Sequence, residues 1–291
     1  MKVIIPLLLF TLLLGGPVQA SSQEERLRIL QRIEILKREI AVVKSLWVNM
    51  RLRQEISASS YIAVSLDDGA VLLEKDGSRQ LPIASVTKLM GAVIVAEYID
   101  MEKSIVVTSE MLKPLGSSPT IFSGLTIQAA HLLRASLIQS ANDASEVLSF
   151  FLEKEAFVNF MNAKATELHM GATVFHDPHG LSLQNQSSAA DLAKLLQYIY
   201  ENHPTLLAIT RENDFWLPDK TGKLLKFQNV NNFYHLKNFK GGKTGYTLAA
   251  KQTLASIFEV NKKPVAIVLL SSSNRQADVF AILRKLQRTA E

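Results

Sequence analysis

The chain has 291 residues, of which 47% are hydrophobic and 20% are charged, with 13 glycines, 9 prolines and no cysteine. This composition excludes intrinsic disorder, collagen-like repeats and disulfide scaffolds, and the absence of cysteine excludes thiolate metal sites and a cysteine nucleophile. The formal net charge of +5 is concentrated near the N-terminus, because residues 58–291 hold 23 basic and 22 acidic residues. A nearly neutral body argues against a nucleic-acid enzyme.

The N-terminus has the layout of a secretion signal. Lys2 precedes an apolar run from Val3 to Leu14, and Gly15–Pro17 breaks that run before Val18-Gln19-Ala20. This layout predicts that residues 1–20 are a signal peptide cleaved after Ala20. The alternative is an uncleaved anchor, but the apolar run is shorter than the roughly 20 residues of a spanning helix. We expect export to the bacterial periplasm or cell envelope, where disulfides are optional.

Residues 21–57 are predicted to form a helical arm. The segment contains no Gly or Pro, and its apolar residues alternate four and three positions apart, which is the spacing of a coiled-coil seam. Three roles stay open: packing on the chain's own domain, self-association or partner binding as a coiled coil, and attraction to an anionic envelope surface. The seam consists of Ile29, Ile33, Leu36, Ile40, Val43, Trp47 and Met50.

Residues 58–291 are predicted to form one α/β domain, after a linker at Ser57–Ser60. Strand-like runs at 61–66 and 70–75 flank Asp67-Asp68-Gly69, and a second pair at 252–260 and 264–271 brackets an Asn-Lys-Lys turn. Strands at both ends predict a sheet whose first and last strands are neighbours, covered by the terminal helix. The helical patterns lie at 87–98, 125–141, 144–169, 189–200 and 276–288.

The first chemical candidate is a serine followed three residues later by a lysine, Ser85 and Lys88. One helical turn places both side chains on the same face. The apolar surround disfavours the charged form of the lysine, so its amine can take the proton of the serine hydroxyl near pH 7. Taken alone, the pair is also explained by a helix-capping serine and a lysine whose charged end reaches water.

Two further short motifs add polar groups suited to the same chemistry. Ser140-Ala141-Asn142 lies between helical patterns, where its hydroxyl and amide can relay a proton or hold a substrate amide; a second Ser-x-Asn, Ser272-Ser273-Asn274, is assigned to a strand-to-helix turn. Lys243-Thr244-Gly245 is expected to open a strand after Gly241-Gly242. Its ammonium and hydroxyl can bind a carboxylate, and its glycine lets a substrate backbone lie against the strand edge.

In this order the three motifs resemble those of the serine penicillin-binding proteins and class A β-lactamases. The surrounding sequence resembles the D-alanyl-D-alanine carboxypeptidases of the low-molecular-mass penicillin-binding class over about residues 58–291. The resemblance implies a five-stranded antiparallel sheet flanked by helices, a helical subdomain and a cleft between them. The matching stretches are Ala84–Met90, Ser140–Ala144, Phe157–Asn162, Asp177–Leu181, Ser187–Ala193 and Lys243–Thr247.

The resemblance also implies a role for each matching residue. Ser85 is the nucleophile that becomes acylated, Lys88 is its base, and Ser140 passes a proton toward the leaving D-alanine. The other residues hold the substrate amide, its terminal carboxylate and, through backbone N–H groups that include that of Ser85, the oxyanion; they are Asn142, Lys243, Thr244, Gly245 and Tyr246. No cofactor and no metal are implied.

The implied function is removal of the terminal D-alanine from peptidoglycan stem peptides, with β-lactams as covalent inhibitors. A D,D-endopeptidase that cuts peptide cross-links shares every motif. A β-lactamase needs a glutamate to activate water, and the candidate considered for this role, Glu155, follows Ser140 too closely and lies inside a helical pattern. A non-catalytic cell-wall scaffold has no use for an activated serine, and His176-Asp177-Pro178-His179 lacks the His-Glu-x-x-His spacing of a zinc peptidase.

Overall fold

The structure of the protein is a computed structural model that describes residues 23–52, 55–112, 120–219 and 221–288. The predicted signal peptide, residues 1–20, lies outside these residues. The chain divides between residues 54 and 55 into two units, which are described separately. In the described part of the chain, no helix combines the length and the apolar character that crossing a membrane requires.

The described residues of the first unit form the helix α2 (Gln23–Leu52), of 30 residues. Its described side chains are exposed from Arg28 to Val43, and Glu34 lies 4.0 Å from Arg38 one turn further on. Ion pairs at this spacing add a few tenths of a kcal/mol to an isolated helix. The large apolar side chains that are exposed are Ile29, Leu30, Ile33, Ile35, Leu36, Ile40, Val42 and Val43.

The second unit is built on a five-stranded sheet with the strand order β2-β1-β11-β10-β9 and antiparallel pairing throughout. The two predicted hairpins are present: β1 (Ser60–Ser65) with β2 (Val71–Lys75), and β10 (Lys251–Val260) with β11 (Lys263–Ser272). Ser60 pairs with Leu270, so the first and last of the predicted strands are neighbours. The remaining edge strand is β9 (Phe239–Thr247).

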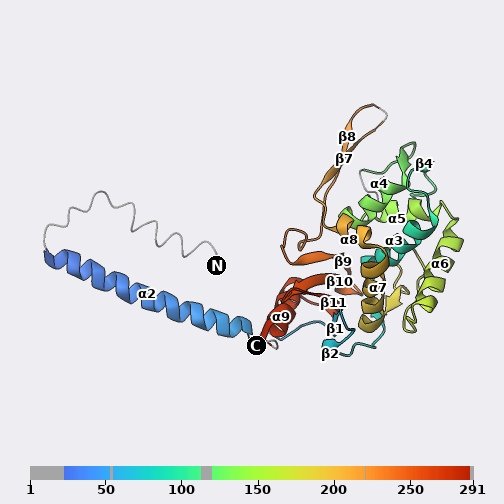
Figure 1. Ribbon diagram of the computed structural model, residues 1–291. Coiled ribbons are helices and arrows are strands. Elements are labelled where there is room, and N and C mark those ends of the chain that lie inside the picture. The colour runs from blue at the N-terminus through green and yellow to red at the C-terminus, as the bar shows by residue number, and fades with distance from the viewer. Residues whose placement is uncertain (1–22, 53–54, 113–119, 220, 289–291) are drawn as a thin grey trace. The chain divides into compact units, whose positions relative to one another are not determined.

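Helices cover both faces of this sheet (Figure 1). On one face lies α9 (Arg275–Arg288); on the other lie α3 (Thr87–Tyr98) and α7 (Ala189–Asn202). The alternation of side chains along β11 explains the two cores, because successive residues of a strand point to opposite faces. Val265, Ile267 and Leu269 belong to the α9 core, and Ala266, Val268 and Leu270 belong to the larger core on the α3 and α7 side.

The helical region differs from its sequence pattern at two places. The predicted helix at 125–141 is divided into β5 (Thr126–Gln128), α4 (Ala129–Arg134) and a π-helical turn at Ala135–Gln139, after which Ser140 is left-handed with φ +61°. The pattern at 144–169 is two helices, α5 (Asn142–Ser149) and α6 (Lys154–Glu167), because Glu153 turns the chain with φ +66°. Apolar spacing continues across both breaks, so periodicity alone did not reveal them.

Short strands and one short helix were also absent from the prediction. They give little periodic signal because most are only two to four residues long. The hairpin formed by β7 and β8 extends away from the body of the unit in Figure 1. These elements are β3 (Leu81–Pro82), β4 (Ser104–Val106), β6 (Gln186–Ser187), α8 (Pro204–Thr210), β7 (Phe215–Pro218) and β8 (Leu224–Phe227).

The predicted linker at Ser57–Ser60 is instead part of the second unit. Ala58 is fully buried and Ser60 is the first residue of β1. The backbone N–H of Ser57 donates to Asp278 Oδ1 in α9 at 2.8 Å. Ser57 therefore links the segment before β1 to the terminal helix α9 by a hydrogen bond.

Candidate active site

Ser85 lies in a short 3₁₀ turn, Ala84–Val86, that leads directly into α3. Ala84 has φ +50°, a left-handed conformation that costs an L-residue about 1–2 kcal/mol. The neighbouring sheet holds the turn, because Thr253 Oγ1 on β10 donates to the carbonyl of Ile83 at 3.0 Å. One helical turn after Ser85, Lys88 Nζ donates to Ser85 Oγ at 3.0 Å, as the sequence spacing predicts.

Lys88 is 1% exposed, and its amine contacts two acceptors besides Ser85. Nζ donates to Asn142 Oδ1 at 2.7 Å and to the backbone carbonyl of His179 at 2.6 Å. Burial lowers the pKa of Lys88 from 10.5 to about 7, although the carboxylates of Asp177 and Asp143 favour its charged form. The amine can therefore gain or lose a proton near neutral pH while it stays bonded to the serine.

A second buried lysine, Lys243, lies on β9. Its Nζ donates to Ser140 Oγ at 2.8 Å and to the carbonyl of Thr244 at 2.9 Å. Burial, and then the nearby charges of Lys88 and Arg275, lower the pKa of Lys243 well below its usual value. A nearby anion stabilises the charged form of this amine, so the position of Lys243 is suited to binding an anionic group.

The prediction that Lys243-Thr244-Gly245 opens a strand is wrong, because β9 begins at Phe239. Gly241 and Gly242 do not precede the strand but form part of it, with φ of +133° and +141°. A Cβ at Gly241 would lie 2.8 Å from Leu207 Cβ in α8, so the glycine permits close packing there.

Gly245 has a structural reason that the sequence did not show. A Cβ built on this residue would lie 2.8 Å from the backbone nitrogen of Ser85 and 2.5 Å from Thr253 Oγ1. The glycine therefore lets β9 lie directly against the turn that carries Ser85. The expected contact of this glycine with a substrate backbone adds to this constraint and does not replace it.

The structure brings the predicted site residues together from four segments. Ser85, Lys88 and Asn142 form one hydrogen-bonded set, and Lys243 and Ser140 form another. The two sets meet because Ser140 and Asn142 are two residues apart at the start of α5. Thr244 is buried beside Lys243, and Tyr246 is 63% exposed on the same strand.

The loop His176-Asp177-Pro178-His179, which lacks zinc-peptidase spacing and overlaps the family-like stretch Asp177–Leu181, contacts Lys88, a role that the sequence did not indicate. The Asp177 carboxylate accepts the backbone N–H of His179 at 2.9 Å and that of Ser182 at 2.6 Å. Burial alone would raise the pKa of Asp177, yet the charge of His179 and the backbone donors lower it. The ionised carboxylate folds the loop so that the His179 carbonyl faces Lys88.

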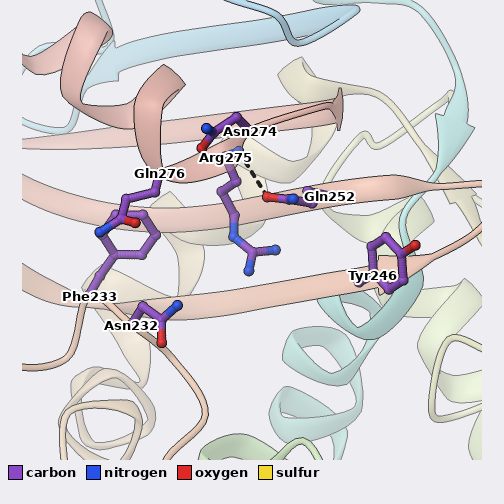
Figure 2. Close-up of a pocket in the computed structure, with 7 residues that line it drawn as sticks. All are labelled: Asn232, Phe233, Tyr246, Gln252, Asn274, Arg275 and Gln276. Atoms are coloured by element: carbon purple, nitrogen blue, oxygen red, sulfur yellow. Dashed lines mark hydrogen bonds between the residues drawn. The ribbon is translucent and has the colours of Figure 1, made fainter. Parts of the chain in front are cut away.

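Arg275 is a further functional candidate that no motif marked. Its Nη1 donates to the carbonyls of Gly245 at 2.9 Å and Thr253 at 3.0 Å. Figure 2 shows the guanidinium pointing into a pocket between Asn232 and Tyr246. Burial lowers the pKa of Arg275 to about 10, so it stays charged at neutral pH. The available sequence signal was its place at the first position of the helix after Ser272-Ser273-Asn274.

We expect Gly180→Ala to destabilise the second unit more than Gly69→Ala does. Both glycines have positive φ, +88° and +73°, so both variants carry the left-handed cost of about 1–2 kcal/mol. Only at Gly180 would the new Cβ clash, 2.0 Å from the Ala84 carbonyl oxygen, whereas Gly69 has no atom within 4 Å. Urea unfolding of the two variants tests this expectation, and equal losses of stability would contradict it.

Comparison with known proteins agrees with this geometry. The chain is 32% identical over 250 residues to a D-alanyl-D-alanine endopeptidase of Pseudomonas aeruginosa, covering 82% of this chain and 79% of that protein. It is 34% identical over 240 residues to the D-alanyl-D-alanine carboxypeptidase DacF of Bacillus subtilis, covering 78% and 61% respectively.

The fold has close counterparts among solved structures. A D-alanyl-D-alanine carboxypeptidase from Mycobacterium tuberculosis superposes with a TM-score of 0.75 at 26% identity, covering 81% of this chain and 92% of the other. The Streptomyces K15 DD-transpeptidase shares the fold with a TM-score of 0.73 at 20% identity, covering 81% and 98%. The predicted fold class is confirmed. Because residues 48–274 also match the family of D-alanyl-D-alanine carboxypeptidases, peptidase family S11, the chain belongs to this family of serine peptidases.

Proposed function

We propose that this peptidase removes the terminal D-alanine from peptidoglycan stem peptides through an acyl-enzyme on Ser85. The observation that carries the proposal is the contact of Ser85 Oγ with the buried amine of Lys88, 3.0 Å away. A serine is a weak nucleophile unless an adjacent base takes its proton. An amine with a pKa of about 7 is such a base at neutral pH.

In the acylation step, Ser85 Oγ attacks the carbonyl carbon of the penultimate D-alanine while Lys88 Nζ takes the hydroxyl proton. The carbonyl oxygen becomes negative and is stabilised by the backbone N–H groups of Ser85 and Tyr246. Removing one donor of this kind costs about 10²- to 10³-fold in other hydrolases. Collapse of the intermediate breaks the peptide bond and leaves the acyl group on Ser85.

The leaving D-alanine needs a proton on its amine, and Ser140 supplies it. Ser140 Oγ accepts a hydrogen bond from Lys243 Nζ, so its own proton is free to pass to the amine and be replaced from the lysine. Asn142 Oδ1 is engaged by Lys88, which leaves its amide N–H₂ to hold a substrate carbonyl. Water then attacks the acyl carbonyl and its proton returns through Ser140 to Lys243, while Lys88 gives the proton it took back to Ser85 Oγ as the ester bond breaks.

The cationic edge of β9 selects a substrate with a carboxylate. Lys243 is buried and Arg275 is half-buried near it, and Thr244 lies between the lysine and Gly245, whose carbonyl Arg275 contacts. A carboxylate bound here relieves the repulsion between the two cations and accepts charge-assisted hydrogen bonds. The terminal carboxylate of a D-Ala-D-Ala stem has the required charge.

Two alternatives are distinguished by different observations. The relatives of Pseudomonas aeruginosa and Escherichia coli that are 32% identical are named D-alanyl-D-alanine endopeptidases, which favours cross-link cleavage as the second candidate activity. The β-lactamase alternative depended on Glu155 as the residue that activates water. Glu155 is exposed in the first turn of α6, which does not support this role.

We expect benzylpenicillin to form a lasting adduct with the wild-type protein and none with Ser85→Ala. Opening of the β-lactam ring by Ser85 Oγ adds the mass of the whole drug, which intact-mass spectrometry detects. Release of D-alanine from a pentapeptide, compared with cleavage of a cross-linked dimer, separates carboxypeptidase from endopeptidase. An adduct on Ser85→Ala, or rapid turnover of the drug without an adduct, would contradict the proposal.

The acylation rate should rise with pH through a midpoint near pH 7. Lys88 is a base only after it loses a proton, and its pKa is lowered to about 7 by burial, so the rate is low below this pH and levels off above it. Stopped-flow acylation from pH 5 to pH 9 measures the profile, with Lys88→Ala as the control that loses the rate throughout. A rate independent of pH over this range would show that another group is the base.

The family acts on cell-wall peptidoglycan, and its members work outside the cytoplasm. We propose that residues 1–20 direct export and are removed after Ala20. For the arm, residues 21–57, we propose self-association rather than binding to a different protein.

The heptad positions of α2 support its pairing with the same helix of a second chain. With Ile33 and Ile40 at position a and Leu36 at position d, the middle of the seam has the residues typical of parallel two-stranded coiled coils, whereas Ile29 and Val43 at position d depart from that pattern. In this register Glu39 faces Lys44 of the second copy, which is favourable, whereas Arg32 faces Lys37, which is not. Because the two charge pairs offset one another, burial of the apolar seam side chains must supply most of the free energy of association.

The full chain without its signal peptide should be a dimer in light scattering, and Ile40→Lys should make it a monomer. A charge at position a lies inside the seam and must be buried on association. Val42→Lys is the matched control, because Val42 is also β-branched and exposed on α2 but lies outside the seam. A monomeric wild-type protein at tens of micromolar, or equal effects of both variants, would contradict self-association.

A further inference from the structure

A second buried charge cluster lies next to Lys88, outside the three motifs. Glu146 is 2% exposed and follows Asn142 by one turn of α5. Its Oε1 accepts a hydrogen bond from Lys154 Nζ at 2.5 Å, and its Oε2 lies 3.5 Å from His179 Nε2. The proposed mechanism gives this carboxylate no role as nucleophile, base or oxyanion donor.

Glu146 connects the same two segments that orient Lys88. Besides Ser85, the amine of Lys88 contacts Asn142 Oδ1 from α5 and the His179 carbonyl from the loop that follows Asp177. Glu146 belongs to α5 and contacts the side chain of His179. The contact between Glu146 and His179 therefore links α5, which supplies Asn142 Oδ1 to Lys88, with the loop that supplies the His179 carbonyl.

A carboxylate lies on each side of the His179 imidazole. Asp177 Oδ1 lies 3.1 Å from Nδ1, which also accepts the backbone N–H of Leu181 at 3.3 Å, and Glu146 Oε2 lies 3.5 Å from Nε2, a charge contact at the outer limit of a hydrogen bond. Asp177 belongs to the same loop and shapes it locally, whereas Glu146 ties the loop to another element. Because the ring and the carbonyl belong to one residue, fixing the ring limits the movement of the carbonyl that Lys88 uses.

We propose that Glu146 is a positioning residue, which holds His179 against α5 and so keeps the amine of Lys88 aimed at Ser85. This inference rests on the proposed function, because it assumes that Lys88 activates Ser85. Glu146 acts through His179 and does not touch the substrate.

The chemistry of Glu146 supports a role of this kind. Burial would raise the pKa of Glu146, but the contact with His179 and the hydrogen bond from Lys154 outweigh burial and lower it. The residue is therefore ionised within a set of charged groups that apolar residues filling the same volume would often match or exceed in stability. An ionised carboxylate adds direction, since it fixes its partners at set distances, which an apolar contact does not do.

The test is Glu146→Gln, which keeps the shape and removes the charge, with Glu97→Gln as the matched control. Glu97 also joins a lysine to a histidine, at 3.0 Å from Lys164 Nζ and 3.1 Å from His203 Nε2, and it is 17% exposed. Neither of its partners contacts Lys88 or an acceptor of Lys88 in the described hydrogen bonds. The two variants remove the same type of contact at different places.

Stopped-flow acylation by a chromogenic cephalosporin separates the limiting rate constant from the dissociation constant of the initial complex. For Glu146→Gln we expect the rate constant to fall about 10- to 100-fold, because misplacement by about 1 Å can cost 10²-fold, while the dissociation constant changes less than about twofold. For Glu97→Gln we expect both constants to stay within about twofold. Binding is preserved because neither glutamate contacts the substrate.

His179→Gln changes the other partner of the same contact, and it replaces Glu146→Gln as the test variant if Glu146→Gln does not fold. If Glu146 acts through His179, the double variant should acylate no more slowly than the slower single variant. An unchanged rate constant in folded Glu146→Gln or His179→Gln, or a double variant whose loss is the product of the single losses, would overturn the inference. Failure of the wild-type protein to acylate would instead overturn the proposed function.

Discussion

The arrangement of the active site follows from the burial of one amine. Lys88 has almost no access to water, so its amine must find hydrogen-bond partners within the protein, since an unpaired buried polar group costs several kcal/mol. Those partners come from three places: the turn before α3, the start of α5, and the loop after Asp177. These segments converge in the second unit, and their convergence places Ser85 beside the amine that we propose as its base.

The second constraint is positive charge that the fold does not neutralise by itself. Lys243 is buried near Lys88 and Arg275, and the charges of these two groups lower its pKa further than burial alone. Stability that the packed core provides offsets this repulsion in the absence of a ligand. In the function that we propose, the substrate carboxylate forms charge-assisted hydrogen bonds with these groups, so the charges that cost stability favour substrate binding.

Much of the fold and of the site could be predicted because the signals are local. The hairpins β1–β2 and β10–β11 show runs of apolar, partly β-branched residues around turn residues. The helices α3, α7 and α9 show continuous helical patterns within one or two residues of their observed bounds. Ser85 and Lys88 share a helix face through their spacing alone. The joining of Ser140, Asn142 and Lys243 to this pair followed from the family resemblance, which carries tertiary information that composition and spacing lack.

The sequence by itself determined which residue types are available for the chemistry and which short segments carry them. Only the tertiary structure decided the left-handed turn at Ser140, the packing of β9 against Ser85 that requires Gly245, and the approach of Arg275 to the strand edge. It also decided that the His179 carbonyl accepts a hydrogen bond from Lys88 and that Glu146 Oε2 lies 3.5 Å from His179 Nε2. These features depend on contacts between distant segments, and a backbone carbonyl is present at every residue, so no residue pattern marks the one that is used.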